Sequence, residues 1–320
     1  MNLVPHQQGM FVGVDVGGTK VAAGLVNPDG EIVSQLRVPM SANGTAQAGL
    51  NAVLMAIAAI LPDGDAGISG IGICAPGPLD PKTGIILNPP NVPCWRNFPL
   101  AEAVQNTHRV PVKLDNDANA AALAEARWGA GRGYRNIFYA TIGTGIGTGI
   151  ILDGKIYHGR TGSAGEGGHV SIDYRGPICR CGKPGCIEIL ASGTAIAQRA
   201  REEIGAGRES SMLKLAEGNL AAITGEIVGQ AADAGDALAK QILTETTTML
   251  ALWLGNMIDL LDPEVIVLGG GAAALLRPFF DQLRDAIPQH TVNPRSHEVA
   301  IRHARYGADS GIAGGAALCG

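Results

Sequence analysis

Three cysteines and one histidine form the most specific chemical pattern in the sequence. His169 precedes Cys179, Cys181 and Cys186, and a Gly-Lys-Pro-Gly turn separates the last two cysteines. Such a Cys₃His set is typical of a structural Zn²⁺ site, because its four ligands complete a tetrahedral shell. Cysteines spaced as Cys-x-Cys pair poorly as a disulfide, so the pattern predicts a zinc ion. The alternative is a loop that carries unrelated thiols.

The turn Asp15-Val-Gly-Gly-Thr-Lys20 also has the residue types for a reaction. Gly17 and Gly18 let backbone N–H groups converge on a phosphate oxygen, while the hydroxyl of Thr19 and the ammonium of Lys20 add donors and charge. Asp15 follows a predicted strand and is suited to hold Mg²⁺ directly or through water. The order differs from that of a P-loop, and an ordinary tight hairpin is the alternative.

A second glycine-rich turn runs from Gly143 to Gly149 and alternates its four glycines, Gly145 among them, with Thr144 and other residues. So many glycines cost conformational entropy unless the backbone must approach another group closely. The spacing is not that of a dinucleotide-binding turn. Together, the two turns predict a nucleoside triphosphate bound between them.

Asn116 and Asp117 lie where a predicted strand ends and a predicted helix begins. A carboxylate at this position can accept the proton of a substrate hydroxyl, while the asparagine fixes that hydroxyl by hydrogen bonding. Asp and Asn are also favoured N-cap residues, so a purely structural cap is the alternative.

Two glutamates, Glu166 and Glu188, flank the histidine and cysteine pattern in sequence. Carboxylates beside a metal-bound histidine suit the recognition of a polyol, because each hydroxyl donates one hydrogen bond and accepts others. A metal on one nitrogen of His169 would leave its other N–H for a sugar hydroxyl.

The composition is that of a globular protein. Among 320 residues, 46% are hydrophobic and 17% are charged, and the net charge of −5 argues against nucleic acid or an anionic membrane as the main partner. The longest apolar stretches, 52–61 and 265–276, are too short to span a bilayer, and no signal peptide is visible. Six cysteines are too few for a disulfide scaffold, which favours a reduced, cytoplasmic protein.

The apolar pattern predicts alternating strands and helices. We expect strands over 11–16, 20–26, 31–38, 71–74, 110–114, 137–142, 150–152, 155–157 and 265–268. We expect helices over residues 50–61, after Asp117, over 236–261, after Gly271 and within 306–318, the last of which could pack back across the domain boundary.

One part of this pattern occurs twice. A strand, a glycine turn, a strand, an Asp-Gly turn and another strand recur about 124 residues apart. The repeat predicts two related α/β domains that face a shared cleft. We expect residues 1–117 and 305–320 to form a smaller domain, and residues 118–304 to form a larger one that carries the zinc site.

In combination, these motifs resemble the ROK family of sugar kinases, repressors and open reading frames, and most closely its bacterial zinc-containing glucokinases. The resemblance runs from Met10 to the C-terminus. It rests on the turn at 15–20, Ala-Pro-Gly-Pro at 75–78, Asn-Asp-Ala-Asn-Ala at 116–120, Gly-Thr-Gly-Ile-Gly at 143–147, Glu-Gly-Gly-His at 166–169 and the cysteine run ending at Glu188. It implies the α/β, actin/hexokinase-like (ribonuclease H-like) duplicated ATPase fold with an interdomain cleft.

The resemblance also implies roles for individual residues. Asp117 would be the general base, the two glycine turns would bind the phosphates of ATP, and Gly269 and Gly270 would lie near its adenosine. The sugar contacts implied are Gly77, Asn91, Asn116, Asp117, Glu166, His169 and Glu188. Asn88 competes with Asn91 for its role, since both occur in Asn88-Pro-Pro-Asn91. Structural Zn²⁺ would bind His169 and the three cysteines.

The predicted function is therefore transfer of the ATP γ-phosphoryl group to the 6-hydroxyl of glucose, with Mg²⁺ neutralising the phosphates. N-acetylmannosamine, N-acetylglucosamine, mannose and fructose remain alternative substrates, and polyphosphate remains an alternative donor. A non-catalytic sugar-sensing regulator is the alternative from another class. Only about nine residues precede the first predicted strand, so no DNA-binding module is expected there. A homodimer is expected from the resemblance.

Overall fold

The computed structural model describes residues 9–61 and 67–320, which form two compact units. Unit 1 comprises Met1–Arg135, Gly149–Gly165 and Ala304–Gly320, and unit 2 comprises Asn136–Thr148 and Glu166–His303. The domain boundary expected after residue 117 would cut a helix that lies wholly in unit 1. The expectation that no DNA-binding module precedes the first strand concerns residues 1–8, outside the described residues.

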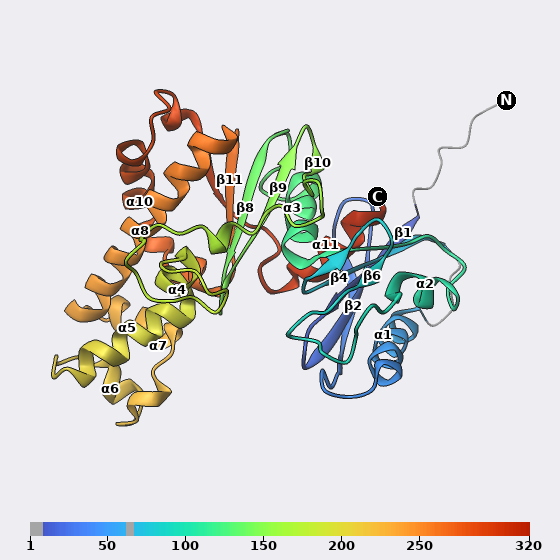
Figure 1. Cartoon of the computed structure of the whole chain (residues 1–320), viewed down its shortest axis with the longest axis horizontal. Coiled ribbons are helices and arrows are strands. Elements are labelled where there is room, and N and C mark those ends of the chain that lie inside the picture. The colour runs from blue at the N-terminus through green and yellow to red at the C-terminus, as the bar shows by residue number, and fades with distance from the viewer. Residues whose placement is uncertain (1–8, 62–66) are drawn as a thin grey trace. The chain divides into compact units, whose positions relative to one another are not determined.

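Unit 1 is built on a five-stranded sheet in the order β3-β2-β1-β4-β7 (Figure 1). Its strands are β1 (Met10–Val16), β2 (Lys20–Val26), β3 (Ile32–Pro39), β4 (Ile68–Ala75) and β7 (Val112–Asn116). The first three strands are antiparallel, whereas β4 pairs in parallel with both β1 and β7. The carboxyl ends of β1, β4 and β7 therefore meet at one edge of the sheet. Two short strands, β5 (Leu79–Asp80) and β6 (Ile85–Ile86), form a separate hairpin.

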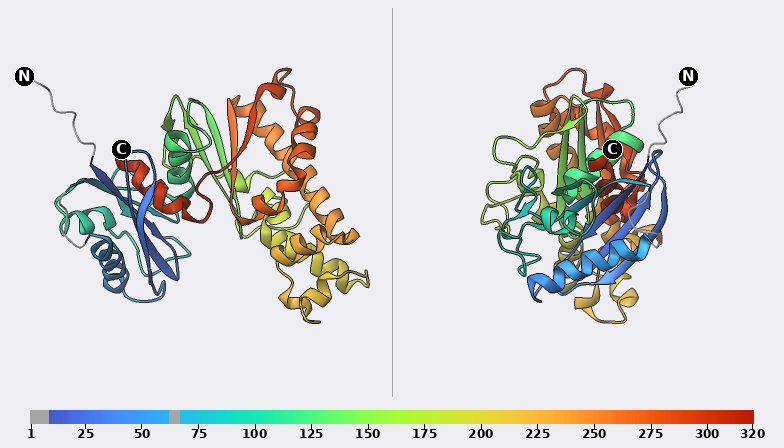
Figure 2. Two further views of the ribbon diagram at one scale, coloured as in Figure 1. Left: turned by 180° about the vertical axis from the view of Figure 1, so that it is seen from behind. Right: turned by 90° about the vertical axis from the view of Figure 1, so that its right-hand side faces the viewer.

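The helices of unit 1 are α1 (Ala46–Ile60), α2 (Leu100–Gln105), α3 (Asp117–Trp128) and α11 (Ser310–Cys319). Both α11 and α3 lie on one side of the sheet, and α1 lies on the other (Figures 1 and 2). The C-terminal helix packs against β1 and β4 at very short range. A Cβ at Gly13 or Gly72 would fall 1.8 Å from the carbonyl oxygen of Ile312 or Gly315, so only glycine fits in these strands.

Unit 2 contains most of the second five-stranded sheet, whose order is β10-β9-β8-β11-β12. The strands are β8 (Ile137–Ile142), β9 (Ile146–Leu152), β10 (Lys155–Ile156), β11 (Val265–Gly269) and β12 (Ala300–His303); β9 begins in unit 2 and ends in unit 1, which also holds β10. Parallel pairing joins β11 to both β8 and β12. The two sheets share one topology, which confirms the predicted duplication.

A long helix, α8 (Ala237–Leu261), is central to the helical part of unit 2. The other helices of this unit are α4 (Ile187–Ala191), α5 (Gly193–Gly205), α6 (Met212–Leu215), α7 (Gly225–Asp233), α9 (Gly271–Leu275) and α10 (Phe280–Ala286). Of these, α4, α5, α7 and α10 contact α8. Trp253 of α8 is fully buried and meets Phe138 of β8 edge to face, with ring centroids 5.5 Å apart.

The single-turn 3₁₀ helices are η1 (Gly167–His169), η2 (Leu220–Ala222), η3 (Arg277–Phe279), η4 (Ile287–His290), η5 (Ser296–Glu298) and η6 (Gly307–Asp309). None of the helices within the described ranges is long and apolar enough to cross a membrane.

Candidate active site

The first glycine turn joins β1 to β2 as a tight hairpin. The N–H of Gly17 donates to the carbonyl oxygen of Lys20 at 2.9 Å, and the carbonyl oxygen of Gly18 accepts from the N–H of Ala42 at 3.0 Å. A Cβ at Gly18 would lie 2.7 Å from the carbonyl oxygen of Asn91, which explains why a glycine occurs there. The side chains of Thr19 and Lys20 are exposed, and so is that of Asn91. The turn therefore presents a hydroxyl, an ammonium group and an amide to solvent.

Asp15 is the penultimate residue of β1, just before this turn, and its carboxylate is largely buried. Burial raises the pKa of Asp15, although a thiol contact with Cys74 and the charges of Lys20 and Arg37 oppose the shift. Gly311 of the C-terminal helix packs directly on this carboxylate, because a Cβ there would lie 2.3 Å from its Cγ. A nearby cation stabilises a partly desolvated carboxylate, so the carboxylate of Asp15 is suited to bind Mg²⁺.

Asn116 and Asp117 occupy the junction between β7 and α3. The side-chain oxygen of Asn116 caps the helix and accepts from the N–H groups of Ala118 and Asn119 at 2.9 and 3.4 Å. The helix cap that was the alternative explanation of Asn116 is thus present. It orients the amide nitrogen of Asn116 toward Gly77, because a Cβ added at Gly77 would lie 3.8 Å from that nitrogen. Both residues were expected to contact a sugar, and the fold places them together.

The carboxylate of Asp117 is exposed at the first residue of α3. One of its oxygens, Oδ1, accepts from the N–H of Ala118 at 2.8 Å. The N-terminus of a helix stabilises a carboxylate anion. The local hydrogen bond therefore fixes the side chain without burying it, which suits a group that must accept a proton from a bound molecule.

The second glycine turn lies between β8 and β9 and is held by Glu188. The N–H of Gly143 donates to the carbonyl oxygen of Gly145 at 2.9 Å, and Oε2 of Glu188 accepts from the N–H of Ile146 at 3.0 Å. A Cβ at Gly145 would lie 2.5 Å from that same carboxylate oxygen. Glu188, expected as a sugar contact, thus braces the glycine turn.

The Glu-Gly-Gly-His segment is shaped by its glycines. Gly168 lies so close to β9 that a Cβ would be 2.0 Å from the carbonyl oxygen of Ile146. Gly167 donates to the hydroxyl of Thr148 at 2.8 Å and accepts from the indole of Trp253 at 3.1 Å. These contacts anchor the first two residues of the single turn η1, while the side chain of Glu166 stays exposed.

The four predicted zinc ligands come together in unit 2. One ligand atom from each of His169, Cys179, Cys181 and Cys186 lies within 4.8 Å of all the others. Nδ1 of His169 is 3.7 Å from the sulfur of Cys179, and the sulfurs of Cys181 and Cys186 are 3.5 Å apart. Ligands about 2.0–2.3 Å from one Zn²⁺ would show such separations. Without a metal, burial and then the neighbouring thiols raise the pKa of Cys186 to about 12.

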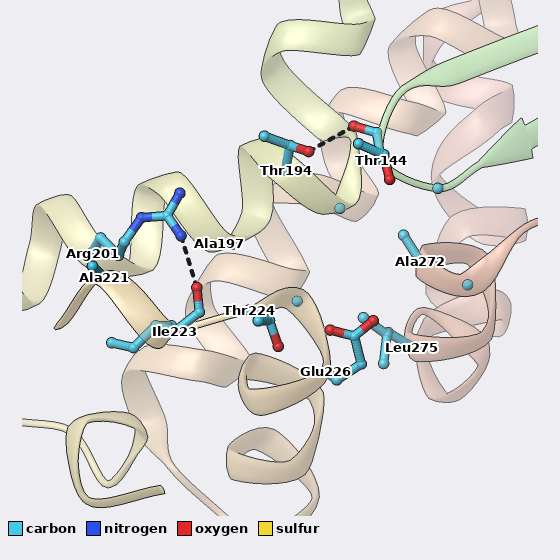
Figure 3. Close-up of a pocket in the computed structure, with 14 residues that line it drawn as sticks. Thr144, Thr194, Ala197, Arg201, Ala221, Ile223, Thr224, Glu226, Ala272 and Leu275 are labelled. Atoms are coloured by element: carbon cyan, nitrogen blue, oxygen red, sulfur yellow. Dashed lines mark hydrogen bonds between the residues drawn. The ribbon is translucent and has the colours of Figure 1, made fainter. Parts of the chain in front are cut away.

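A cavity of about 460 Å³ adjoins the second glycine turn within unit 2 (Figure 3). Gly143 and Thr144 form one wall, and the other lining residues are Gly193, Thr194, Ala197, Arg201, Ala221, Ile223, Thr224, Gly225, Glu226, Gly271, Ala272 and Leu275. The hydroxyl of Thr194 donates to the carbonyl oxygen of Thr144 at 2.8 Å, and Arg201 donates to that of Ile223 at 2.7 Å. The backbone of the second glycine turn and the mixed polar and apolar walls of the cavity suit a nucleoside that lies next to phosphate groups.

Two glycines expected near adenosine, Gly269 and Gly270, do not line this cavity, although the next residue, Gly271, does. Gly270 has a φ of 89° and caps α9, and a Cβ there would lie 2.4 Å from the carbonyl oxygen of Ile142. Its visible role is therefore to turn the backbone into α9. The contributions of α5 and α7 to the cavity were missed, because Thr194, Thr224 and Glu226 form no local motif with either glycine turn.

The two sheets of shared topology, each with a glycine turn between its first two strands, define the actin/hexokinase-like α/β fold. The chain belongs to the ROK family, whose model matches residues 11–320. This membership confirms the family resemblance drawn from the motifs.

Three relatives illustrate how closely the chain resembles known proteins. It is 36% identical over 313 residues to a glucokinase of Halalkalibacterium halodurans, a match that covers 95% of this chain and 93% of the relative. It is 30% identical to an N-acetylmannosamine kinase of Salmonella typhi over 95% of this chain and 96% of the relative. A crystal structure of a ROK family glucokinase from Streptomyces griseus, in complex with glucose and AMPPNP, matches with a TM-score of 0.81 and 34% identity over 97% of this chain and 99% of that one.

Proposed function

We propose that this protein is an ATP-dependent hexose kinase that phosphorylates the 6-hydroxyl of glucose. The observation that carries the proposal is the exposed carboxylate of Asp117, fixed at the N-terminus of α3 beside the capping residue Asn116. Similarity to glucokinases along nearly the whole chain supports a hexose kinase over a non-catalytic regulator.

Asp117 accepts the proton of the sugar hydroxyl as the oxygen attacks the γ-phosphorus of ATP. The bond between the γ-phosphorus and the bridging oxygen breaks, and ADP leaves with the electron pair. Phosphoryl transfer of this kind depends mainly on positioning and on neutralising charge. The amide of Asn116 orients the hydroxyl, and Gly77, Asn91, Glu166, His169 and Glu188 are the further sugar contacts proposed.

The nucleotide is assigned to the glycine turns and to the cavity of Figure 3. The turn between β1 and β2 supplies Thr19 and Lys20 to the phosphates, and the turn between β8 and β9 supplies backbone N–H groups. When bound, Mg²⁺ neutralises phosphate charge, and Asp15 is the residue proposed to hold it.

The Cys₃His cluster is proposed to hold structural Zn²⁺. Bound through Nδ1, His169 would keep its Nε2–H as a donor for a sugar hydroxyl, since the metal fixes the tautomer. A cytoplasmic location is proposed as well, because thiols stay reduced in that compartment. A homodimer is also proposed, and light scattering of the purified protein tests it.

The decisive experiment measures ADP release with ATP and a panel of glucose, N-acetylmannosamine, N-acetylglucosamine, mannose and fructose. We expect the highest kcat/KM with glucose and no turnover with 6-deoxyglucose, which lacks the accepting hydroxyl. A higher kcat/KM with N-acetylmannosamine would favour that alternative, to which the similarity to the Salmonella typhi kinase points. No ADP release from ATP with any sugar, together with no sugar phosphate formed from polyphosphate, would leave the non-catalytic regulator as the remaining function.

A further inference from the structure

Next to the proposed base lies a buried carboxylate that the proposed mechanism does not use. Asp115 is 4% exposed in β7, two residues before Asp117, and pairs in register with Cys74 of β4. An ionised carboxylate at such depth is costly unless hydrogen bonds and a cation compensate for its lost hydration. Its partners therefore bear on the conformation of the strand end.

Each oxygen of Asp115 has its own partners. Oδ1 accepts from the backbone N–H of Asn116 at 2.7 Å and from the side-chain amide of Asn119 at 3.2 Å. Oδ2 lies 2.6 Å from Nε2 of His158. The carboxylate thus joins the backbone of the proposed sugar-orienting residue to an imidazole that lies far away in sequence.

Asn119 shows that this arrangement is constrained. Its side chain is 3% exposed in the first turn of α3, and its Oδ1 makes no hydrogen bond with any described residue. A buried oxygen without a partner costs free energy. The side chain of Asn119 keeps this orientation despite that cost, so its donation to Asp115 is what sets the orientation. A shift of Asp115 would therefore disturb both Asn116 and α3.

His158 follows β10 and is positioned by its own backbone contacts. The neighbouring Tyr157 donates its N–H to the carbonyl oxygen of Ile150 at 2.8 Å, and the carbonyl oxygen of His158 accepts from Ala164 at 3.2 Å. The side chain is 30% exposed, so protons exchange with solvent while the carboxylate partner stays buried.

The hydrogen bond with Asp115 raises the pKa of His158; burial opposes the shift, the charge of Asp115 supports it, and the charge of Lys82 opposes it. A cavity of about 340 Å³ also borders the pair, and its charged lining residues are Lys113, Asp115, Arg127 and Lys155. Asp115 is thus the acid that faces His158, and the remaining charged groups are cations.

We propose that His158 is a positioning residue for phosphoryl transfer: through Asp115 it holds the end of β7 so that Asn116 and Asp117 face the substrate hydroxyl. The proposal rests on the kinase function proposed above. Breaking the contact leaves a buried carboxylate without its cation, and the strand end relaxes around it. A displacement of even 1 Å at a catalytic group can slow a reaction greatly.

Two substitutions separate the parts of this contact. His158→Gln keeps a hydrogen-bond donor but removes the charge, and His158→Ala removes both. We expect kcat with glucose to fall about tenfold in the alanine variant and less in the glutamine variant. The KM for ATP should stay unchanged in both, because His158 belongs neither to the two glycine turns nor to the lining of the cavity assigned to the nucleotide. His297→Gln, an exposed histidine 4.0 Å from Glu298, is the matched control and should leave kcat unchanged.

The pH profile supplies a readout that a merely structural contact would not move. A raised histidine pKa means that the charged pair is complete below about pH 6.5 and is lost as the pH rises through the higher folded value. The kcat of the wild type should therefore fall on that alkaline side, and the kcat of His158→Gln should be flat there.

Wild-type kcat and pH profile in both variants would overturn the proposal. The proposal would also be overturned if the activity fell only as much as the amount of folded protein, measured by thermal unfolding, while the pH profile of kcat stayed unchanged. If the wild type phosphorylates no hexose, the kinase proposal fails instead. An NMR titration of the His158 imidazole, with and without Asp115→Asn, then still tests the pair, and an unshifted pKa would reject it.

Discussion

At the scale of single residues, the proposed chemistry depends on one carboxylate that is both fixed and accessible. The N–H of Ala118 donates to the side-chain oxygens of both Asp117 and Asn116, and the N–H of Asn119 also donates to Asn116. One short segment therefore caps α3 and presents an acid and an amide nitrogen. The cap and the catalytic role, which compete as explanations of the sequence, are compatible in the structure.

Asp117→Asn tests the assignment of the base. Asparagine preserves the shape and the acceptor oxygen but cannot take a proton, so kcat should fall by about 10²–10⁴-fold with little change in the KM for glucose. Steady-state ADP release measures both constants. Asp281→Asn, which alters a carboxylate exposed in α10, is the control and should behave as the wild type. Near-normal turnover by Asp117→Asn would show that the base is another group.

Sequence reasoning was strongest where the residue types themselves determine the local structure. The four zinc-ligand candidates and the two glycine turns occur where their motifs placed them, because a cluster of thiols or a run of glycines has few structural uses. It was weaker for Glu188, whose visible partner is the backbone of Ile146. Burial and long-range hydrogen bonds decide such roles, as they do for Asp115 and His158, and no local pattern encodes them.

At the scale of elements, the abundance of glycine in the sequence is explained in part by close packing of α11 on the sheet of unit 1. Glycines occur on both sides of this contact, in β1 and β4 and in the helix itself. Gly315 meets the backbone of β1 and β4 so closely that a Cβ would lie 2.5 Å from the carbonyl oxygen of Gly72. The predicted small-residue helix thus packs on the N-terminal sheet.

Gly72→Ala tests this packing. Its Cβ would lie 1.8 Å from the carbonyl oxygen of Gly315, and neither backbone can yield as a flexible side chain would. We expect the free energy of unfolding to fall by about 1–3 kcal/mol or more. The urea midpoint measures this change. Gly271→Ala, where nothing lies within 4 Å of the added carbon, is the control and should not lower the midpoint.

The Cys₃His cluster brings the segment around Cys179 and Cys181 close to the start of α4 and to the turn η1. Cys181→Ser should abolish stoichiometric zinc in elemental analysis, because one thiolate of the tetrahedral set is lost. The KM for glucose should rise by roughly tenfold if the metal orients His169. Cys94→Ser, which lies outside the cluster, should retain the metal. Zinc loss with an unchanged KM for glucose would refute the orienting role of the histidine.

At the scale of the whole molecule, duplication gives each sheet the same device, a glycine turn between its first two strands. The two copies have since acquired different surroundings. The turn in unit 1 is followed by Thr19 and Lys20, whereas the turn in unit 2 is braced by Glu188 and borders a cavity. The first copy therefore offers charged and hydroxyl side chains, whereas the second offers mainly backbone groups. Within unit 1, Asp15 lies near the end of β1 and Asp117 directly follows β7, and β4 pairs in parallel with both strands.

Binding of both substrates should therefore stabilise the folded chain even when no reaction occurs. In Asp117→Asn, glucose or MgATP at a hundredfold excess over its Kd should each raise the free energy of unfolding by about 2.7 kcal/mol, since a ligand of the folded state alone has this effect. Thermal unfolding with and without each ligand measures the shift. Galactitol at the same concentration is a polyol control without a pyranose ring and should leave the midpoint unchanged. A shift with MgATP but none with glucose would retain the nucleotide assignment and reject glucose as the sugar, because the variant keeps every proposed sugar contact except the ionised base.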